Sequence, residues 1–175
     1  MGSKYNDSEV TVRRANKVDM SAVAEMIQEL ADFEKMSDGP QLSIKDLQND
    51  GFESQPPAFR CIVAESTSDK RILGYALYFP TYSTWQGRSM MLEDLYVRPS
   101  ERKRGVGHRL FNAVAKEAKL SGSSRLDFHV LEWNDARSFY EGKGALNLTK
   151  SEQWCYYRLT GSALHEVAEQ ATEII

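Results

Sequence analysis

Residues 102–108 read Arg-Lys-Arg-Gly-Val-Gly-His, a basic turn that contains two glycines. The turn follows an apolar run that ends at Val97 and precedes a run to Leu120 in which apolar residues recur at helical spacing. The sequence therefore predicts a strand, a basic turn and a helix in succession. Because the first N–H groups of a helix lack intrahelical partners and carry the positive end of its dipole, such a turn suits an anion, most naturally a phosphate.

The residue types in this turn support that interpretation but do not decide it. Gly105 and Gly107 have no Cβ, so a ligand could approach the backbone closely. Charge-assisted donors would come from Arg102, Lys103 and Arg104. The stretch is not a P-loop, and the dinucleotide fingerprint would need a third glycine where Leu110 stands. On these residues alone, a solvated helix entry and a phosphate cradle both remain open.

The overall composition limits the class of protein. The chain has 175 residues, of which 41% are apolar and 27% charged, a balance typical of a folded domain with a substantial core. The net charge of −3 gives no general attraction to nucleic acid or to acidic membranes. We therefore expect a single domain over residues 1–175, with flexible ends at 1–8 and 171–175, and no nucleic-acid or membrane partner.

Cysteine and histidine are too few and too scattered to suggest a disulfide framework or a metal site. Cys61 and Cys155 each lie in an apolar, strand-like run and are expected to be buried, reduced thiols. No apolar run approaches the ~18–20 residues that span a bilayer, and the polar N-terminus lacks the apolar stretch of a signal peptide. The expected location is cytoplasmic, and no metal is expected.

Hydrophobic periodicity predicts an α/β fold. Strands are predicted at residues 10–13, 59–65, 72–79, 90–97, 125–131 and 154–159. Helices are predicted after Asp19, which can cap the first of them, after a capping-box sequence at 43–46, over 105–120 and after Asn134, which caps a short helix, with a helix-like C-terminal end. This order favours a mixed central sheet with antiparallel N-terminal strands, a parallel central pair and helices on both faces.

One predicted strand carries two adjacent carboxylates. Glu93 and Asp94 interrupt the otherwise apolar run 90–97. Side chains alternate along a strand, so the two carboxylates are expected on opposite faces of the sheet. A buried carboxylate without a partner is costly, so at least one of them should face a cleft or a cation. From composition alone, solvated charges on an edge strand remain the alternative.

A set of separate motifs in a fixed order resembles the diamine (spermidine/spermine) acetyltransferase family of the GNAT superfamily. The Arg102-x-x-Gly105-x-Gly107 turn resembles the acyl-CoA pyrophosphate loop of that superfamily. The other motifs lie at 29–35 (ELADFEK), 50–52 (DGF), 82–87 (YSTWQG), 92–97 (LEDLYV), 132–134 (EWN), 139–140 (FY) and 144–145 (GA). The resemblance covers the chain from about Val12 to Tyr157. It implies a GNAT fold and an N-acetyltransferase that uses acetyl-CoA as cosubstrate, by direct attack in a ternary complex.

The resemblance also implies roles for individual residues. Glu93 would contact the substrate amine and remove its proton, directly or through a water, and Tyr140 would protonate the leaving CoA thiolate. Proton removal is needed because a primary amine, with a pKa near ~10.4, is protonated at neutral pH. The residues expected to bind acetyl-CoA are Leu95, Tyr96, Val97, Arg102, Lys103, Arg104, Gly105, Val106, Gly107, His108, Asn134, Asp135, Ala136, Arg137 and Tyr140. Those expected to bind the amine are Phe33, Glu34, Trp85, Glu93, Asp94, Asp127, Phe128, His129, Glu152 and Trp154.

Structural roles remain the alternatives at several of these positions. A tyrosine on a helix, such as Tyr140, usually packs, and a strand histidine such as His129 is more often structural. Trp154 is as easily a core aromatic as a substrate contact. The resemblance further implies that backbone N–H groups of residues 95–97 polarise the thioester carbonyl, a kind of contact worth on the order of 3–4 kcal/mol where measured.

The choice of amine remains open. Ser83-Thr84 before Trp85, together with residues 33–38 (FEKMSD), resembles the thialysine N-epsilon-acetyltransferase branch, whereas the polyamine branch carries Asp-Pro at 83–84. Loss of an acid there weakens the case for a long polycation. The alternatives are a spermidine/spermine acetyltransferase and a non-catalytic binding module on a GNAT scaffold. The acidic total charge disfavours nucleic-acid binding through residues 98–104. The family resemblance implies that the protein forms a homodimer.

Overall fold

The computed structural model describes residues 9–171 of the chain. The chain divides into two compact units, residues 1–131 and residues 132–175. A single domain over the whole chain therefore stays a prediction. Of the ends that we expected to be flexible, 1–8 and 171–175, all but Ala171 lie outside the described residues.

The first unit is built on a sheet with the strand order β1-β2-β3-β4-β5. The strands are β1 (Val10–Arg14), β2 (Arg60–Ser66), β3 (Ile72–Ser83), β4 (Gly87–Val97) and β5 (Leu126–Phe128). Neighbouring strands are antiparallel from β1 to β4, and β4 and β5 run parallel. The predicted α/β class, with antiparallel N-terminal strands and a parallel pair, is confirmed.

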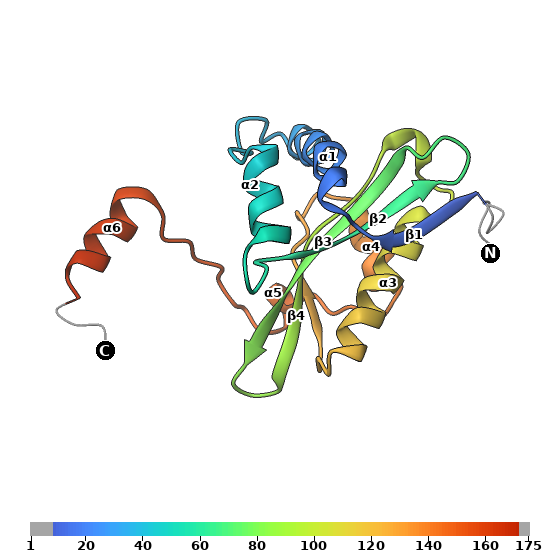
Figure 1. Cartoon of the computed structure of the whole chain (residues 1–175). Helices are drawn as coiled ribbons and strands as arrows, with labels where there is room; N and C mark the ends of the chain where they lie inside the picture. Colours follow the sequence, from blue (N-terminus) through green and yellow to red (C-terminus); the bar gives the residue numbers. More distant parts are fainter. Residues whose placement is uncertain (1–8, 172–175) are drawn as a thin grey trace. The chain divides into compact units, whose positions relative to one another are not determined.

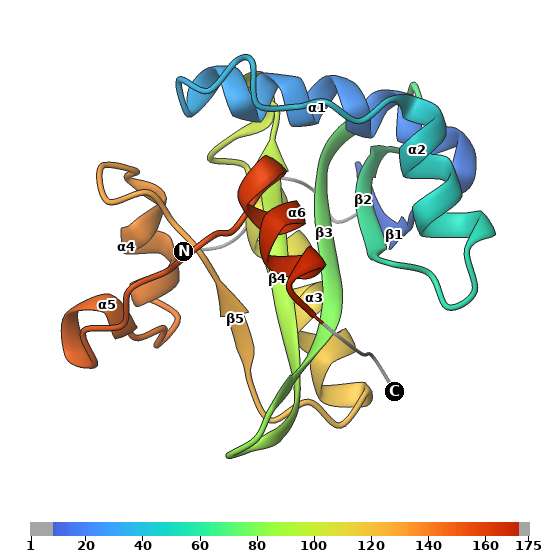
Figure 2. The same ribbon diagram turned by 90° about the vertical axis from the view of Figure 1, so that its left-hand side faces the viewer.

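Helices cover both faces of this sheet, as predicted (Figure 1). On one face lie α1 (Met20–Phe33) and α2 (Ile44–Gln48), and on the other lies α3 (Val106–Leu120). Figure 2 shows α1 running across one end of the strands, with α3 behind the sheet. Three short turns connect these elements: η1 (Lys17–Asp19), η2 (Asn49–Glu53) and η3 (Pro99–Glu101).

Each face of the sheet has its own hydrophobic core. The cluster under α3 contains the helix residues Val106, Leu110, Val114 and Ala118, which recur every four residues and so form one stripe. The cluster under α1 and α2 contains Met20, Val23, Met26 and Leu47, all nearly inaccessible to solvent. The apolar spacing that predicted α1 and α3 therefore also identified the faces that they bury.

Two predicted helix starts had different outcomes. At α2 the capping box is confirmed, because the Ser43 side chain accepts the Asp46 N–H and the Asp46 carboxylate accepts the Ser43 N–H. At α1, Asp19 is the N-cap residue, but the predicted cap is wrong in that its side chain makes no hydrogen bond to the helix. The Asp19 carboxylate instead binds the Arg13 guanidinium, at 2.7 and 3.0 Å, and accepts the Asn16 N–H. A buried carboxylate gains more from a guanidinium than from a helix N–H group, so it joins β1 to the turn that follows.

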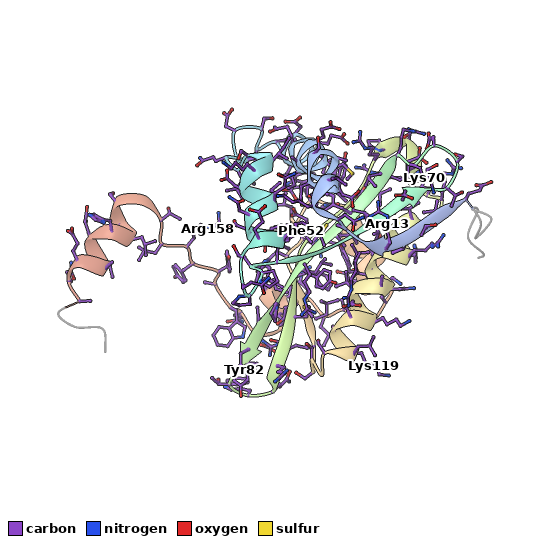
Figure 3. All side chains as sticks on the ribbon, viewed as in Figure 1. Arg13, Phe52, Lys70, Tyr82, Lys119 and Arg158 are labelled. Carbon is purple, nitrogen blue, oxygen red and sulfur yellow. The ribbon has the colours of Figure 1, made fainter. Side chains whose placement is uncertain are left out.

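The second unit is helical and extended within the described residues. Its helices are α4 (Ala136–Glu141), α5 (Leu148–Ser151) and α6 (Gly161–Glu169). The strand predicted at 154–159 is wrong, since these residues are exposed and no described strand pairs with them. Figure 3 labels Arg158 on this segment. Alternating apolar residues do not make a strand unless a neighbour pairs its backbone groups.

Burial was predicted for both cysteines and is confirmed for one of them. Cys61 on β2 is a buried free thiol, whereas Cys155 is a free thiol that is exposed. The apolar run that suggested burial of Cys155 is the same run that failed to form a strand. None of the described helices is long and apolar enough to cross a membrane.

A substitution of Gly74 tests how closely β3 approaches β4. A Cβ at Gly74 would lie 2.6 Å from the Tyr96 carbonyl oxygen, a backbone atom that cannot move without disturbing the strand pairing. We expect Gly74→Ala to lower the free energy of unfolding by about 1–3 kcal/mol, measured by urea unfolding. The control is Gly107→Ala in α3, where the added Cβ meets Val97 Cγ2 at 3.7 Å and the helix should gain up to ~1 kcal/mol. Equal urea midpoints for the two variants would contradict this account.

Candidate active site

A β-bulge at Glu93 divides β4 into two parts. In the pairing of β3 with β4, Leu77 lies opposite Asp94 and Tyr78 lies opposite Leu92. Glu93 is therefore an extra residue with no partner on β3. Our sequence-based expectation for this strand assumed unbroken alternation, which the bulge interrupts.

The bulge reverses which residues of β4 face α3. Before it, Met90 and Leu92 belong to the core under α3, and after it, Leu95 and Val97 pack against the same core. A regular strand would have put Asp94 on the same face as Leu92. Because of the extra residue, Asp94 instead lies on the α1 face, and Glu93 is exposed.

Asp94 is a partly buried carboxylate whose hydrogen bond comes from Tyr75 on β3. The Tyr75 hydroxyl donates to Asp94 Oδ2 at 2.8 Å. Burial raises the pKa of Asp94 to about 6; the neighbouring Glu93 and Glu34 carboxylates act in the same direction, and the Tyr75 hydrogen bond opposes them. Burial also raises the pKa of Glu34, which directly follows α1. Two predicted amine-binding acids, Glu34 and Asp94, therefore share one region with Glu93.

The second part of β4 has backbone groups that no described strand pairs on the side toward β5. The parallel pairing with β5 covers Met90 to Leu92 and stops there. At the end of β4 the Arg98 N–H donates to the Leu73 carbonyl of β3. Since backbone direction alternates, the N–H groups of Leu95 and Val97 point away from β3. These are two of the three residues predicted to polarise a carbonyl oxygen.

The basic turn lies between β4 and α3, as predicted. Lys103 and Gly105 have φ values of 60° and 87°, in the left-handed region. Glycine adopts this conformation freely, whereas lysine does so at a cost. The helix begins at Val106, and no side chain of the described residues caps its first N–H groups. Its Gly107 is open, since an added Cβ would meet only a methyl group at ordinary contact distance. The turn thus has the features that suit an anion.

Two of the three cations in the turn contact groups of the protein itself. Arg104 Nη1 lies 3.0 Å from Glu101 Oε2. Arg102 Nε donates to the Val97 carbonyl at 2.9 Å, and its guanidinium lies over the rings of Phe33 and Tyr96, 5.4 Å from each centroid. Lys103 and His108 are exposed. Binding of a phosphate by Arg102, Lys103, Arg104 or His108 stays a prediction.

The C-terminal end of α1 is held against β4 by charged groups. Tyr96 donates its hydroxyl to Glu29 Oε2 at 2.9 Å, and Arg98 Nη1 lies 2.9 Å from Glu29 Oε1. These contacts bring Phe33 and Glu34 next to the turn and the carboxylates of β4. Phe33 and Glu34, which are both predicted to bind the amine, are therefore in the same region as Asp94.

Other predicted amine-binding residues of the first unit lie elsewhere. Trp85 is 83% exposed in the turn of the β3–β4 hairpin, near Tyr82, which Figure 3 labels at the tip. The end of β4 next to this turn is Gly87, and it lies six strand residues, about 20 Å, from Glu93. On β5, Asp127 accepts from Arg125, and Phe128 packs edge-on against Phe111 of α3.

His129 lies just beyond β5, which ends at Phe128, so the expectation that it lies on a strand is wrong. The predicted strand over 125–131 was too long because only three of its residues find partners on β4. The His129 side chain is exposed. Its contact with an amine stays a prediction.

The second unit holds the remaining predicted residues. Asn134 Oδ1 accepts the Ala136 N–H at 2.9 Å, which confirms that Asn134 caps α4, and Asp135 occupies the N-cap position itself. Arg137 donates to the Glu132 carbonyl. Tyr140 is buried, and burial raises the pKa of its phenol to about 12, so the phenol is protonated at neutral pH.

Glu152 and Trp154 form a local pair after α5. Trp154 Nε1 donates to Glu152 Oε2 at 2.7 Å. Trp154 is 62% exposed, so the alternative reading of this residue as a core aromatic is wrong. A direct substrate contact by either residue stays a prediction.

Sequence reasoning missed Tyr75. Within its strand, Tyr75 looks like any core aromatic, and it is fully buried. Its partner became apparent only from the register of β3 on β4 and from the bulge that turns Asp94 toward it. The available signal was indirect, namely two adjacent acids in an apolar strand. Among residues 9–171, no group of three or more acidic, histidine or cysteine side chains is arranged to hold a metal.

The raised pKa of Asp94 predicts a pH-dependent effect of Asp94→Asn. The folded protein holds the Asp94 proton more tightly than the unfolded chain, whose value is near ~3.9. This contribution to stability is therefore fully present below about pH 4 and is lost as the pH rises through about 6. The neutral amide of the substituted side chain avoids that loss, so we expect the variant to be more stable than the parent at pH 8, by on the order of 2 kcal/mol, with the difference vanishing near pH 4.

Urea unfolding at both pH values measures this difference. Exposed Asp38→Asn is the control and should change little at either pH. An Asp94→Asn variant that is less stable than the parent at pH 8 would show that the carboxylate is stabilised, not strained, by its surroundings.

Three comparisons identify the family. Residues 24–144 match the model of the acetyltransferase (GNAT) family. The chain is 39% identical over 166 residues to thialysine N-epsilon-acetyltransferase of Bos taurus, covering 91% of this chain and 97% of that protein. It is 32% identical to the spermidine/spermine N(1)-acetyltransferase-like protein 1 of Homo sapiens, over 90% of this chain and 23% of that protein. A solved V. cholerae integron cassette protein aligns with a TM-score of 0.72 and 26% identity, over 93% of this chain and 99% of that one. The chain belongs to the GNAT acetyltransferase family and is an acyltransferase.

Proposed function

We propose that this protein transfers the acetyl group of acetyl-CoA to the primary amine of a small substrate, thialysine or a related amine, by direct attack in a ternary complex. The bulge in β4 carries the proposal. It gathers two carboxylates and two N–H donors that no described strand pairs, those of Leu95 and Val97, on one short segment directly before the basic turn. Acetyl transfer to an amine needs these groups, because the amine arrives as a cation and the carbonyl oxygen becomes negative in the transition state.

The basic turn is the proposed site for the pyrophosphate of acetyl-CoA. No described side chain caps the start of α3, so its N–H groups are available. Gly105 has no Cβ, an added Cβ at Gly107 would meet only a methyl group, and Lys103 carries an exposed ammonium group. Arg102 would keep its contacts with Val97 and the two rings, or exchange them for a phosphate oxygen. The bound cosubstrate supplies the acetyl thioester.

The acids of β4 and α1 would receive the amine. Glu34, Glu93 and Asp94 attract the ammonium group, and Glu93 takes its proton directly or through a water. The nitrogen lone pair then attacks the thioester carbonyl carbon. The N–H groups of Leu95 and Val97 stabilise the oxygen that becomes negative, and the C–S bond breaks as the amide forms.

Tyr140 is the proposed donor to the departing thiolate. Because burial keeps its phenol protonated, it is ready to donate at neutral pH. A thiol has a pKa near ~8.5, below that of the phenol, so Tyr140 first stabilises the thiolate by a hydrogen bond. The phenol proton then passes to the sulfur, and solvent water returns a proton to the phenol.

Thialysine is favoured over a long polyamine by the similarity to thialysine N-epsilon-acetyltransferases, 39% identical in Bos taurus. The turn after β3 supports the same choice. There Ser83 Oγ accepts the N–H groups of Trp85 and Gln86, so a hydroxyl organises the turn and adds no anion for a second ammonium group. A spermidine/spermine acetyltransferase is the second candidate, because the human spermidine/spermine N(1)-acetyltransferase-like protein is also similar. A homodimer and a cytoplasmic location stay predictions.

An amine panel tests the function. The full chain is incubated with acetyl-CoA and thialysine, lysine, spermidine, spermine or short diamines, and free thiol is followed. We expect the highest kcat/KM with thialysine. Higher kcat/KM with spermidine or spermine would favour the second candidate. Absence of amine-dependent thiol release with every compound would refute the proposed function.

Two matched lysines test the pyrophosphate site. Lys103 and Lys70 have nearly the same left-handed φ, 60° and 61°, and Lys70 lies in the β2–β3 turn. We expect Lys103→Gly and Lys70→Gly to relieve similar backbone strain and to gain roughly 1 kcal/mol of stability each. Lys103→Gly alone should weaken acetyl-CoA binding, about fivefold, in titration calorimetry. Equal affinities of the two variants would exclude Lys103 from the site.

Replacement of the Tyr140 hydroxyl tests the donor. We expect Tyr140→Phe to lower kcat by about 100-fold while the KM for the amine changes little, because the phenol acts on the leaving group. Tyr157→Phe, in the same unit and 87% exposed, should leave both parameters unchanged. A Tyr140→Phe variant with the parent's kcat would remove Tyr140 from the mechanism.

A further inference from the structure

The Tyr75–Asp94 hydrogen bond joins two residues of neighbouring strands on the α1 face of the sheet. Tyr75 is fully buried, and its hydroxyl donates to Asp94 Oδ2 at 2.8 Å. Asp94 Oδ1 accepts no hydrogen bond from residues 9–171, and the residue is only partly buried. One carboxylate oxygen is therefore fixed by the protein, and the other is left to a further partner.

We propose that Tyr75 is a positioning residue for amine acetylation: its hydroxyl orients Asp94 and keeps it ionised, so that Oδ1 binds the substrate ammonium group. This inference rests on the proposed function and adds to it a residue outside the set that the sequence indicated. It gives Asp94 a defined part, as the anchoring counter-ion, beside Glu93 as the proton acceptor.

The charges around Asp94 support this role. The titratable groups that act on it are Tyr75 and Cys61 from β3 and β2, Glu93 from β4 and Glu34 from the end of α1. These groups are neutral or acidic, and none of them is a cation. A carboxylate withdrawn from water among other carboxylates lacks the positive partner that normally compensates it. An incoming ammonium group supplies that missing charge.

A neutral donor suits this position better than a built-in cation would. An arginine beside Asp94 would keep the carboxylate ionised but would also compete with the substrate for it. The Tyr75 phenol supports the anion by one hydrogen bond and carries no charge, since burial and the neighbouring Asp94 raise its pKa well above the ordinary value. The Asp94 carboxylate can therefore be ionised and still lack a cationic partner when the amine arrives.

Tyr78 on the same strand is a matched control. It is also fully buried, but it belongs to the core under α3, on the opposite face from Tyr75. Within the described residues its hydroxyl has no hydrogen-bond partner. Tyr75→Phe and Tyr78→Phe therefore each remove one buried oxygen from β3, and only the first removes a hydrogen bond to Asp94.

The first measurement does not depend on activity. In the full chain with 13C-labelled aspartate, the carboxyl resonance of Asp94, assigned by its loss in Asp94→Asn, is titrated by NMR. We expect its pKa to rise by about one unit in Tyr75→Phe, because the hydrogen bond favours the ionised form, and to stay unchanged in Tyr78→Phe. An equal titration of Asp94 in the two variants would overturn the proposal.

The second measurement follows kcat/KM for the amine against pH. We expect the acidic limb of the profile to move upward in Tyr75→Phe by the same amount as the NMR titration, with a roughly fivefold loss of kcat/KM near pH 6 that is recovered above pH 8. The KM for acetyl-CoA should not change. In an Asp94→Asn background, Tyr75→Phe should have no further effect on the amine KM.

The outcomes separate this inference from the proposed function. A shifted NMR titration with an unshifted amine profile would overturn the role of Asp94 as the amine's counter-ion while the acetyltransferase function stands. A parent protein that acetylates no amine would overturn the proposed function and this role together. Tyr75→Phe effects that persist in the Asp94→Asn background would reduce Tyr75 to a packing residue and overturn the proposal.

Discussion

The arrangement of the first unit depends on one extra residue in β4. Without Glu93 as a bulge, the strand would keep a single alternation, and Asp94 would lie under α3 among apolar side chains. A carboxylate there would be costly and could reach no substrate. With the bulge, both halves of β4 contribute apolar residues to the core under α3, and the carboxylate is turned to the face where α1 ends. The bulge at Glu93 thus allows the same strand to supply apolar residues to the core under α3 and carboxylates to the other face.

A second constraint is the attachment of α1 to β4. Tyr96 and Arg98 bind Glu29, and Arg98 also approaches Glu25, so the end of the helix is held by charged groups next to the strand. The aromatic ring of Phe33 then lies under the Arg102 guanidinium. The turn that would bind the cosubstrate and the helix that would bind the amine therefore share contacts, although they are distant in sequence. A displacement of the turn would therefore change the position of the end of α1, and a displacement of α1 would change the position of the turn.

The sequence predicted those features that depend on local patterns. Helical spacing located α1 and α3, the capping box at Ser43 located α2, and the apolar run around Glu93 located β4. It failed where the outcome depends on a partner distant in sequence. Asp19 was expected to cap a helix but binds Arg13, and residues 154–159 have a strand's composition but no strand to pair with. The bulge and the Tyr75 hydrogen bond depend on strand register, which no local pattern encodes.

The part of β4 that no described strand pairs on its β5 side has a consequence for association between molecules as well as for chemistry. A strand with free N–H and C=O groups is a template for another extended chain, and such edges promote aggregation. Here the segment without a described neighbour is short, it starts with the irregular residue Glu93, which twists it, and it carries two adjacent carboxylates. A second strand could add only by placing its own backbone against those charges and by following the bulge. The acids that are proposed to select an amine would therefore also prevent this edge from joining with a neighbouring molecule.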